Sequence, residues 1–240
     1  MPVHAELITA VRRTLADAAD PVRAAAQQRY MKSAMPYRGL TSADLKVRMR
    51  ALLTDERFRL ADERSWDDTV RRLWDGAEYR EERYAALAIA KDRRYRTWST
   101  GHGAVPLYRH LVETGAWWDY VDDVAAHLLA PVLRAHHAET ADVVRRWAQD
   151  EHLWVRRAAI LSQLGAKAAT DTALLTDCLD ANLQGSRHGN EFFIRKAIGW
   201  ALRDYAKTDS DWVKDLVADR GDRLSPLSRR EALKHLAAKA

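Results

Sequence analysis

The sequence predicts an all-α protein, an α-solenoid of antiparallel helix pairs. Apolar residues recur at three- and four-residue steps along nearly the whole chain, as in the stripe of Val70, Leu73 and Trp74. No run alternates apolar and polar residues for long enough to indicate a strand. Glycines such as Gly115 and Gly165 fall in or beside the gaps between periodic segments. The pattern therefore indicates a succession of helices with short connections.

Start signals support several helices in the first half of the chain. Thr41 and Asp44 are typical of a capped helix N-terminus, and Asp67 and Asp68 favour a helix start through the helix dipole. In order, the helices expected here are 4–17, 21–33, 41–54, 65–76, 79–93 and 104–114.

Similar signals continue in the second half. Thr140 and Asp142 are typical of a helix start, and Ser225 is followed by Pro226, which is favoured in a first turn. The helices expected here are 116–129, 139–149, 151–165, 170–183, 190–206, 209–219 and 226–238.

Successive helix pairs are spaced by roughly 35–45 residues, within the range of HEAT and armadillo repeats. The two most similar segments are 66–90 and 140–164, each with a VRR helix followed by an arginine- and alanine-rich helix. No low-complexity linker interrupts the sequence, so we expect residues 1–240 to form a single domain. Its second helices would line a concave basic face.

Composition permits a nucleic-acid partner without requiring one. The chain has 39 Lys and Arg against 34 Asp and Glu, a net charge of +5, and is 47% hydrophobic. No stretch approaches the roughly 20 apolar residues of a membrane span, and the N-terminus lacks the apolar core of a signal peptide. The lone Cys178 excludes an internal disulfide and a cysteine-based metal site. These features favour a cytoplasmic protein, and for a DNA-binding one a nucleoid association.

An acid and an indole share one helical stripe in the segment AWWDYVDD. Trp118 and Asp122 are four residues apart and so are neighbours on a helix, while Trp117 points about 100° away from Trp118. Such a pair could hold a cationic group against the ring while the carboxylate balances its charge or directs a water. The alternatives are a tryptophan in the core and a surface carboxylate paired with an arginine.

Basic and aromatic residues gather in three further segments, QQRYMKSAMPYRGL, HLWVRRAAILSQL and FFIRKAIGWALRDYAK. On matched helices they would line one wall and neutralise phosphates, although a solvated face or core packing would explain each alone. The candidates for DNA binding are Tyr30, Lys32, Arg38, Arg156, Arg195, Lys196 and Arg203.

Metal and phosphate-loop chemistry finds no support in the sequence. His136 and His137 are adjacent and cannot share a helix face, and nothing matches HExxH, a glycine-rich phosphate loop or a nucleophile elbow. We therefore expect no metal and no cofactor. The lack of a histidine cluster also disfavours a metal-dependent phosphodiesterase.

With these motifs in this order, residues 20–237 resemble the AlkD family of DNA alkylation-repair glycosylases. The resemblance implies a HEAT-like solenoid that acts on double-stranded DNA. We expect a monomer, because one concave face must wrap the duplex. It also implies hydrolysis of the N-glycosidic bond of cationic alkylpurines, such as N7-methylguanine and N3-methyladenine, without base flipping. Matched position by position, the catalytic aspartate falls on Asp122, its partner tryptophans on Trp118 and Trp200, the essential arginine on Arg157, and a lesion-proximal tyrosine on Tyr30.

Several alternatives stay open beside this resemblance. The chain could be a self-resistance glycosylase that removes a bulky natural-product adduct, or a non-catalytic solenoid that binds DNA or protein. Within the glycosylase hypothesis, we expect Asp122 to stabilise the sugar cation and Arg157 to hold an adjacent phosphate. The loop LQGSRHGNEFF is longer than the resemblance predicts, and Arg187 and His188 there could add backbone contacts.

Overall fold

The computed structural model describes residues 3–236, and every regular element in that range is a helix. The all-α prediction is confirmed, and the helical architecture agrees with the predicted α-solenoid. By internal packing, residues up to Ser99 form one compact unit and residues from Thr100 onward form a second. None of the described helices is long and apolar enough to cross a membrane.

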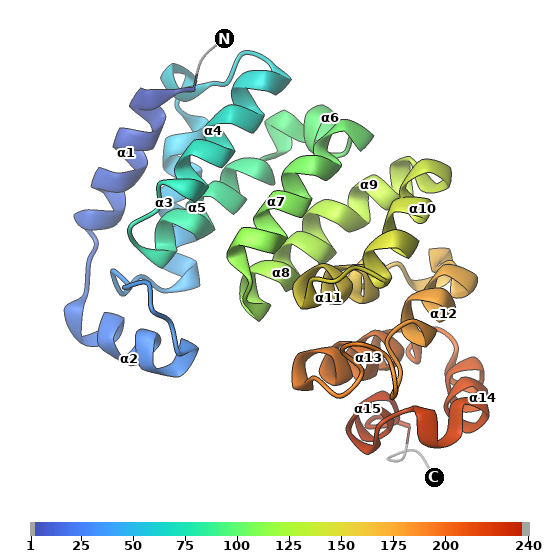
Figure 1. Ribbon diagram of the computed structural model, residues 1–240. Coiled ribbons are helices and arrows are strands. Elements are labelled where there is room, and N and C mark those ends of the chain that lie inside the picture. Colours follow the sequence, from blue (N-terminus) through green and yellow to red (C-terminus); the bar gives the residue numbers. More distant parts are fainter. Residues whose placement is uncertain (1–2, 237–240) are drawn as a thin grey trace. The chain divides into compact units, whose positions relative to one another are not determined.

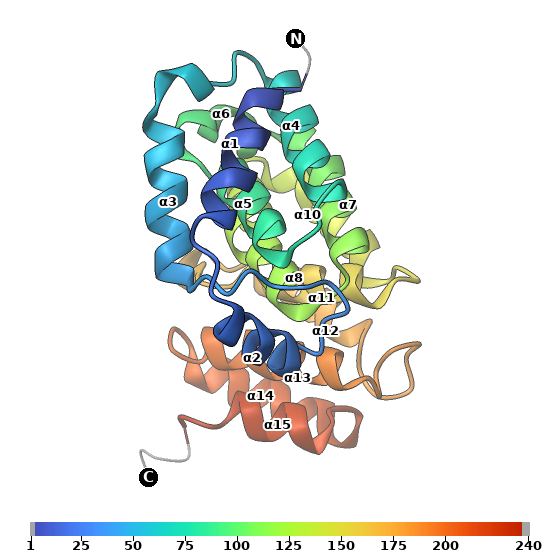
Figure 2. The ribbon, with the colours of Figure 1, turned by 90° about the vertical axis from the view of Figure 1, so that its left-hand side faces the viewer.

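The first unit packs around α1, which lies between α3 and α4 and also contacts α5 (Figure 2). Leu7, Val11 and Leu15 on α1 are fully buried, and Trp66 and Trp74 of α4 fill the core beside them. Its helices are α1 (Ala5–Ala16), α2 (Pro21–Met31), α3 (Ser42–Thr54), α4 (Glu63–Asp75), α5 (Arg80–Ala90) and the short α6 (Arg96–Ser99).

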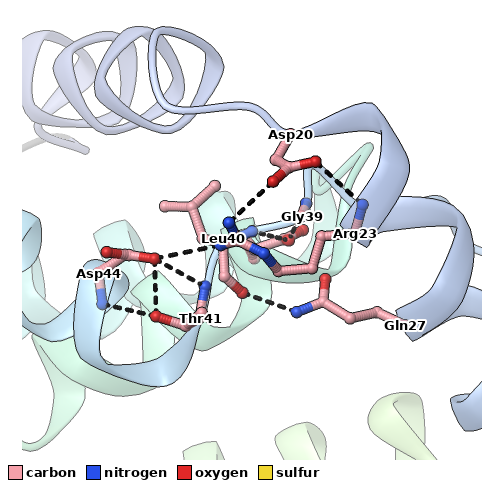
Figure 3. A network of polar contacts seen from close by, with 8 residues as sticks. Asp20, Arg23, Gln27, Gly39, Leu40, Thr41 and Asp44 are labelled. Atoms are coloured by element: carbon pink, nitrogen blue, oxygen red, sulfur yellow. Dashed lines mark hydrogen bonds and ion pairs between the residues drawn. The ribbon is translucent and has the colours of Figure 1, made fainter.

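Helix α2 is attached mainly through a polar network at its start (Figure 3). The Asp20 carboxylate caps the helix by accepting the Arg23 N–H at 3.0 Å, and the Gln27 amide donates to the Leu40 carbonyl at 2.9 Å. Gly39 has φ +93°, and a Cβ there would lie 2.1 Å from the Asp20 carbonyl oxygen. Only glycine fits this close approach.

A buried carboxylate holds the same loop from the other side. Glu81 on α5 is 1% exposed and accepts the backbone N–H groups of Arg38, Gly39 and Leu40 at 2.9, 2.8 and 3.2 Å. Three backbone donors on one carboxylate satisfy a charge that would otherwise be costly to bury. The loop that joins α2 to α3 is thereby fixed to the core of the first unit.

The second unit is arranged around α11, which packs against α7, α8, α10, α12 and α13 (Figure 1). Helix α13 makes its largest interface with α15. The helices are α7 (Val105–Gly115), α8 (Trp118–Val124), α9 (Ala130–Ala135), α10 (His137–Ala148), α11 (Leu153–Leu161), α12 (Thr172–Asp180), α13 (Phe192–Tyr205), α14 (Ser210–Arg220) and α15 (Pro226–Ala232).

One helix continues past the point where the sequence predicts its end. Residues 125–129 form a π-helical turn between α8 and α9, in which the Ala130 N–H bonds to the Ala125 carbonyl. Pro131 has no N–H to give to the residue four positions earlier. The wider π turn brings Pro131 into the first turn of α9, where proline is tolerated. The prediction that the helix ends at 129 was therefore wrong, as was the omission of α6.

Gly199 sets how closely α13 and α15 approach. A Cβ at this position would lie 2.5 Å from the Glu231 Cβ and 3.0 Å from the Ser228 carbonyl oxygen, both on α15. The glycine in the middle of α13 therefore has a packing role that outweighs its low helix propensity.

Candidate functional site

Helix α8 places Trp118 and Asp122 four residues apart, as the sequence predicts. The preceding Trp117 turns instead into a cluster of aromatic rings, with ring centroids 5.9 Å from Trp154 and 5.5 Å from Phe193. Trp118 is half-buried. The two adjacent tryptophans thus have different surroundings, with Trp117 joining α8 to the starts of α11 and α13.

Asp122 and Arg157 form a bidentate ion pair between α8 and α11. The Arg157 Nε donates to Oδ1 at 2.7 Å and Nη2 donates to Oδ2 at 2.9 Å. The side chains are 13% and 5% exposed respectively. The third guanidinium nitrogen, Nη1, donates to the Phe193 carbonyl at the start of α13. One arginine therefore fixes the carboxylate and links three helices.

The surroundings of Asp122 oppose its ionisation, and Arg157 favours it. Burial raises the pKa of the Asp122 carboxyl above its usual value, the hydrogen bonds and charge of Arg157 work against this rise, and the negative charges of Asp119 and Asp123 add to it. A permanently charged guanidinium in bidentate contact is the strongest partner a carboxylate finds in proteins. The result is an oriented carboxylate with a perturbed pKa, which is typical of functional sites.

Asp122 lies in the wall of an open cleft of about 680 Å³. Trp200 of α13 lines the same cleft, so the structure brings together two of the four predicted catalytic residues there, and Arg157 stands behind Asp122. Trp118 is not among the lining residues. The cleft is lined by Asp119, Asp122, Asp123, Ala126, His127, Arg134, Leu164, Gly165, Ala166, Trp200 and Asp204.

Five charged or titratable lining residues were not predicted from the sequence: Asp119, Asp123, His127, Arg134 and Asp204. Asp123 and His127 follow Asp122 along the same helix and face each other at 3.9 Å. Asp204 lies four residues after Trp200, so helical spacing from that predicted residue would have found it, whereas Asp123 and His127 lie one and five residues after Asp122 and do not follow from this rule. Asp119, three residues before Asp122, was visible by the same rule.

The two adjacent arginines, Arg156 and Arg157, both make internal contacts in the structure. Arg157 uses three of its five N–H groups on Asp122 and Phe193. Arg156 is 6% exposed and donates to Asn182 and to the backbone carbonyls of Gln149, Asp150 and Ala181. Arg156 was predicted to bind DNA, and in the structure its guanidinium is buried and engaged by these internal acceptors.

Cations on α13 are also paired within the protein. Lys196 contacts a Glu231 oxygen at 3.0 Å, and Arg203 contacts the other Glu231 oxygen. These partners hold the pKa of Glu231 below its usual value. Arg195 is half-buried in the first turn of α13. The basic stripe predicted on this helix is therefore partly neutralised by α15.

The candidates of the first unit differ in exposure. Tyr30 on α2 is 78% exposed, and Lys32, directly after the helix, is exposed as well. Arg38 is half-buried, stacks over the Tyr79 ring at 3.8 Å and lies 3.7 Å from Glu82. Tyr30 and Lys32 stay candidates for DNA contact, whereas Arg38 is already engaged.

A larger cleft of about 840 Å³ lies at the C-terminal end of the second unit. It is lined by Arg229, Arg230 and Lys234 among others, with no aromatic residue. The smaller cleft carries the aromatic–carboxylate pair, so it is the better candidate for chemistry.

Within residues 3–236, no group of three or more His, Cys, Asp and Glu side chains is arranged to hold a metal ion. Cys178 is 1% exposed in α12, as expected of a core thiol, and burial raises its pKa to about 12. A thiol of that kind is neither a nucleophile nor a ligand at neutral pH.

Comparison with known proteins gives a consistent result. The profile of the family described as DNA alkylation repair enzyme matches residues 11–236. The solved structure of a predicted DNA alkylation repair enzyme from Enterococcus faecalis superposes with a TM-score of 0.80 at 28% sequence identity, covering 92% of this chain and 98% of that one. None of the curated proteins matches. The family match spans nearly the whole chain, and the protein therefore belongs to the DNA alkylation repair enzyme family.

Proposed function

We propose that the protein is a DNA glycosylase that hydrolyses the N-glycosidic bond of cationic alkylpurines and leaves an abasic site. The observation that carries this proposal is the Asp122 carboxylate, fixed by Arg157 in the wall of a cleft that Trp200 also lines. Membership of the DNA alkylation repair family supplies the class of partner, DNA.

The chemistry suits a carboxylate and a ring without a metal. An alkylpurine such as N7-methylguanine carries a positive charge, so the bond between C1′ and the base nitrogen breaks with its electron pair leaving on the base, which becomes neutral. The sugar is left with oxocarbenium character. A water oxygen then bonds to C1′ and releases its proton. The enzyme has to stabilise the sugar cation and position that water.

Asp122 and Trp200 can supply both functions. A carboxylate near C1′ stabilises the developing cation and accepts a hydrogen bond from the attacking water. An indole face attracts a cation by about 0.5–2 kcal/mol. Trp118, at the start of the same helix as Asp122, is proposed to contribute a second aromatic ring that attracts the sugar cation.

Arg157 is proposed to position the carboxylate rather than to bind the substrate. Its two hydrogen bonds leave Asp122 little rotational freedom, and its charge counteracts the effect of burial on the Asp122 pKa. An open cleft, in place of an enclosed pocket, also suits an enzyme that acts on a sugar at the duplex surface. This supports catalysis without base flipping.

The test is single-turnover release of N7-methylguanine from a defined duplex. Wild type should release the base, and Asp122→Asn should be slower by at least about 100-fold, the scale of losing one preorganised electrostatic group, with duplex affinity retained. Asp215→Asn is the matched control, because Asp215 is exposed on α14 and lies outside the cleft.

A wild-type protein that binds the duplex but releases neither methylated bases nor bulkier cationic adducts would contradict the proposal and favour the non-catalytic scaffold. Release of uracil as fast as N7-methylguanine would contradict the cation-based mechanism.

A further inference from the structure

The candidate cleft is more acidic than a DNA-binding surface ordinarily is. Four carboxylates line it: Asp119, Asp122, Asp123 and Asp204. DNA carries one negative charge per roughly 1.7 Å of duplex. A cleft that attracts a cationic sugar will repel the phosphates on either side of it, so a cation is needed to offset that repulsion.

The cations nearest to the cleft are mostly engaged elsewhere. Arg157 is bound to Asp122 and the Phe193 carbonyl, and Lys207 donates to Asp204 at 2.8 Å. His127 faces Asp123 at 3.9 Å and is charged only when protonated. None of these supplies a free permanent charge to a phosphate.

Arg134 differs from all of them. It lies in the last turn of α9, lines the cleft and is exposed. Among the described residues its guanidinium makes no hydrogen bond and no ion pair. A planar guanidinium with free N–H groups is the side chain best suited to bidentate phosphate binding.

The position of Arg134 also restricts which phosphate it can reach. Arg134 follows Asp122 by twelve residues along one continuous helical stretch. At 1.5 Å per residue this separates their backbones by about 18 Å. One DNA strand rises 3.4 Å per nucleotide, so a sugar at Asp122 and a phosphate at Arg134 lie within about five nucleotides of each other.

We propose that Arg134 binds a DNA backbone phosphate at the edge of the Asp122 cleft and offsets the repulsion between the cleft carboxylates and DNA. The contact is with the backbone and is independent of sequence. The inference rests on the proposed function, which places the damaged nucleotide at Asp122. It gives Arg134 the phosphate contact that the sequence analysis expected of Arg157.

The experiment measures binding to a duplex that carries a tetrahydrofuran abasic analogue, so no base release is needed. Arg134→Gln is compared with wild type and with Arg146→Gln. Arg146 is the matched control because it is exposed on α10, its guanidinium makes no hydrogen bond or ion pair among the described residues, and it lies outside the cleft. Arg134→Lys keeps the charge and should restore part of the affinity.

Arg134→Gln should weaken binding and lower the slope of log affinity against log salt by about 0.9, the value for one phosphate contact. Its affinity deficit relative to wild type should then shrink by about 3.5-fold between 50 and 200 mM salt.

A scan with single neutral methylphosphonates then locates the phosphate. One substitution, within about five nucleotides of the lesion, should weaken wild type and leave Arg134→Gln unaffected. The proposal would be overturned if Arg134→Gln and Arg146→Gln lost equal affinity for the duplex. It would also be overturned if every methylphosphonate that weakens binding by wild type weakened binding by Arg134→Gln to the same extent. Failure of base release by wild type would instead overturn only the proposed glycosylase activity, since this assay reports binding alone.

Discussion

Replacing Arg157 by methionine tests the central ion pair of the second unit. The substitution removes a guanidinium that is 5% exposed and leaves the Asp122 carboxylate, 13% exposed, without its partner. It also leaves the Phe193 carbonyl without its donor. Breaking a buried pair by removing one partner costs about 3–5 kcal/mol. For a chain of this size that lowers the melting temperature by about 6–20 °C.

The loss of stability in Arg157→Met depends on pH, and the protonation of Asp122 determines its sign. With Arg157 gone, burial and the neighbouring carboxylates raise the pKa of the folded-state carboxyl further above its unfolded value. A carboxyl with a raised folded-state pKa destabilises the protein when ionised. This penalty is absent below the unfolded pKa of about 3.9 and grows as the pH rises through the folded-state pKa.

The assay is thermal or urea unfolding, with Arg157→Met compared with the double variant Arg157→Met/Asp122→Asn. At pH 7 the double variant should be the more stable of the two, because it carries no unpaired buried charge, and the two should converge as the pH falls toward about 4. Equal stability of the single and double variants at pH 7 would refute the interpretation of Asp122 and Arg157 as a buried, mutually dependent pair.

Three further predictions concern other parts of the protein. Enzyme-dependent excision should fall in acid, because the ionised form of Asp122 is the active one. The midpoint of the pH–rate profile should lie above the usual pKa of an aspartate, because burial raises the pKa of Asp122. A midpoint at or below the usual value would contradict this. Glu81→Gln should lower the free energy of unfolding by about 1–3 kcal/mol and speed hydrogen exchange at the Arg38 amide, since one acceptor oxygen replaces two; unchanged exchange would argue against that contact. Gly199→Ala should destabilise the protein by about 1–3 kcal/mol through its clash with Glu231, although alanine favours helices by about 1 kcal/mol relative to glycine. A higher stability of the variant in urea unfolding would show that α15 shifts to accommodate the added methyl group.

Local periodicity was enough to predict the helices and the stripe that carries Trp118 and Asp122. Both depend on residues close together in the chain, where helical geometry fixes which side chains are neighbours. The same local reasoning was wrong after residue 129, where it ended a helix that in fact continues into α9. The π turn before Pro131 removes the conflict, and nothing in the spacing of apolar residues indicates it.

The roles of the arginines could not be predicted in the same way. The sequence shows that Arg156 and Arg157 are cationic, but the Arg156 acceptors Ala181 and Asn182 lie 25 and 26 residues away along the chain. Burial directs the Arg156 guanidinium to these internal acceptors, which local spacing does not reveal. Arg134 shows the opposite case, since only the packing of the second unit brings it to the cleft that holds Asp122.

The pairing of Asp122 with Arg157 also answers how a DNA-binding protein tolerates a central carboxylate. Seen from a phosphate several ångströms away, the two opposite charges nearly cancel, so Asp122 contributes little repulsion to the approach of DNA. A sugar cation against the carboxylate is much closer to Asp122 than to the guanidinium behind it, and it is attracted. For the other three carboxylates of the cleft, Asp119, Asp123 and Asp204, the proposed offset is Arg134. Loss of Arg157 should therefore reduce stability and base release, whereas loss of Arg134 should reduce the affinity for DNA.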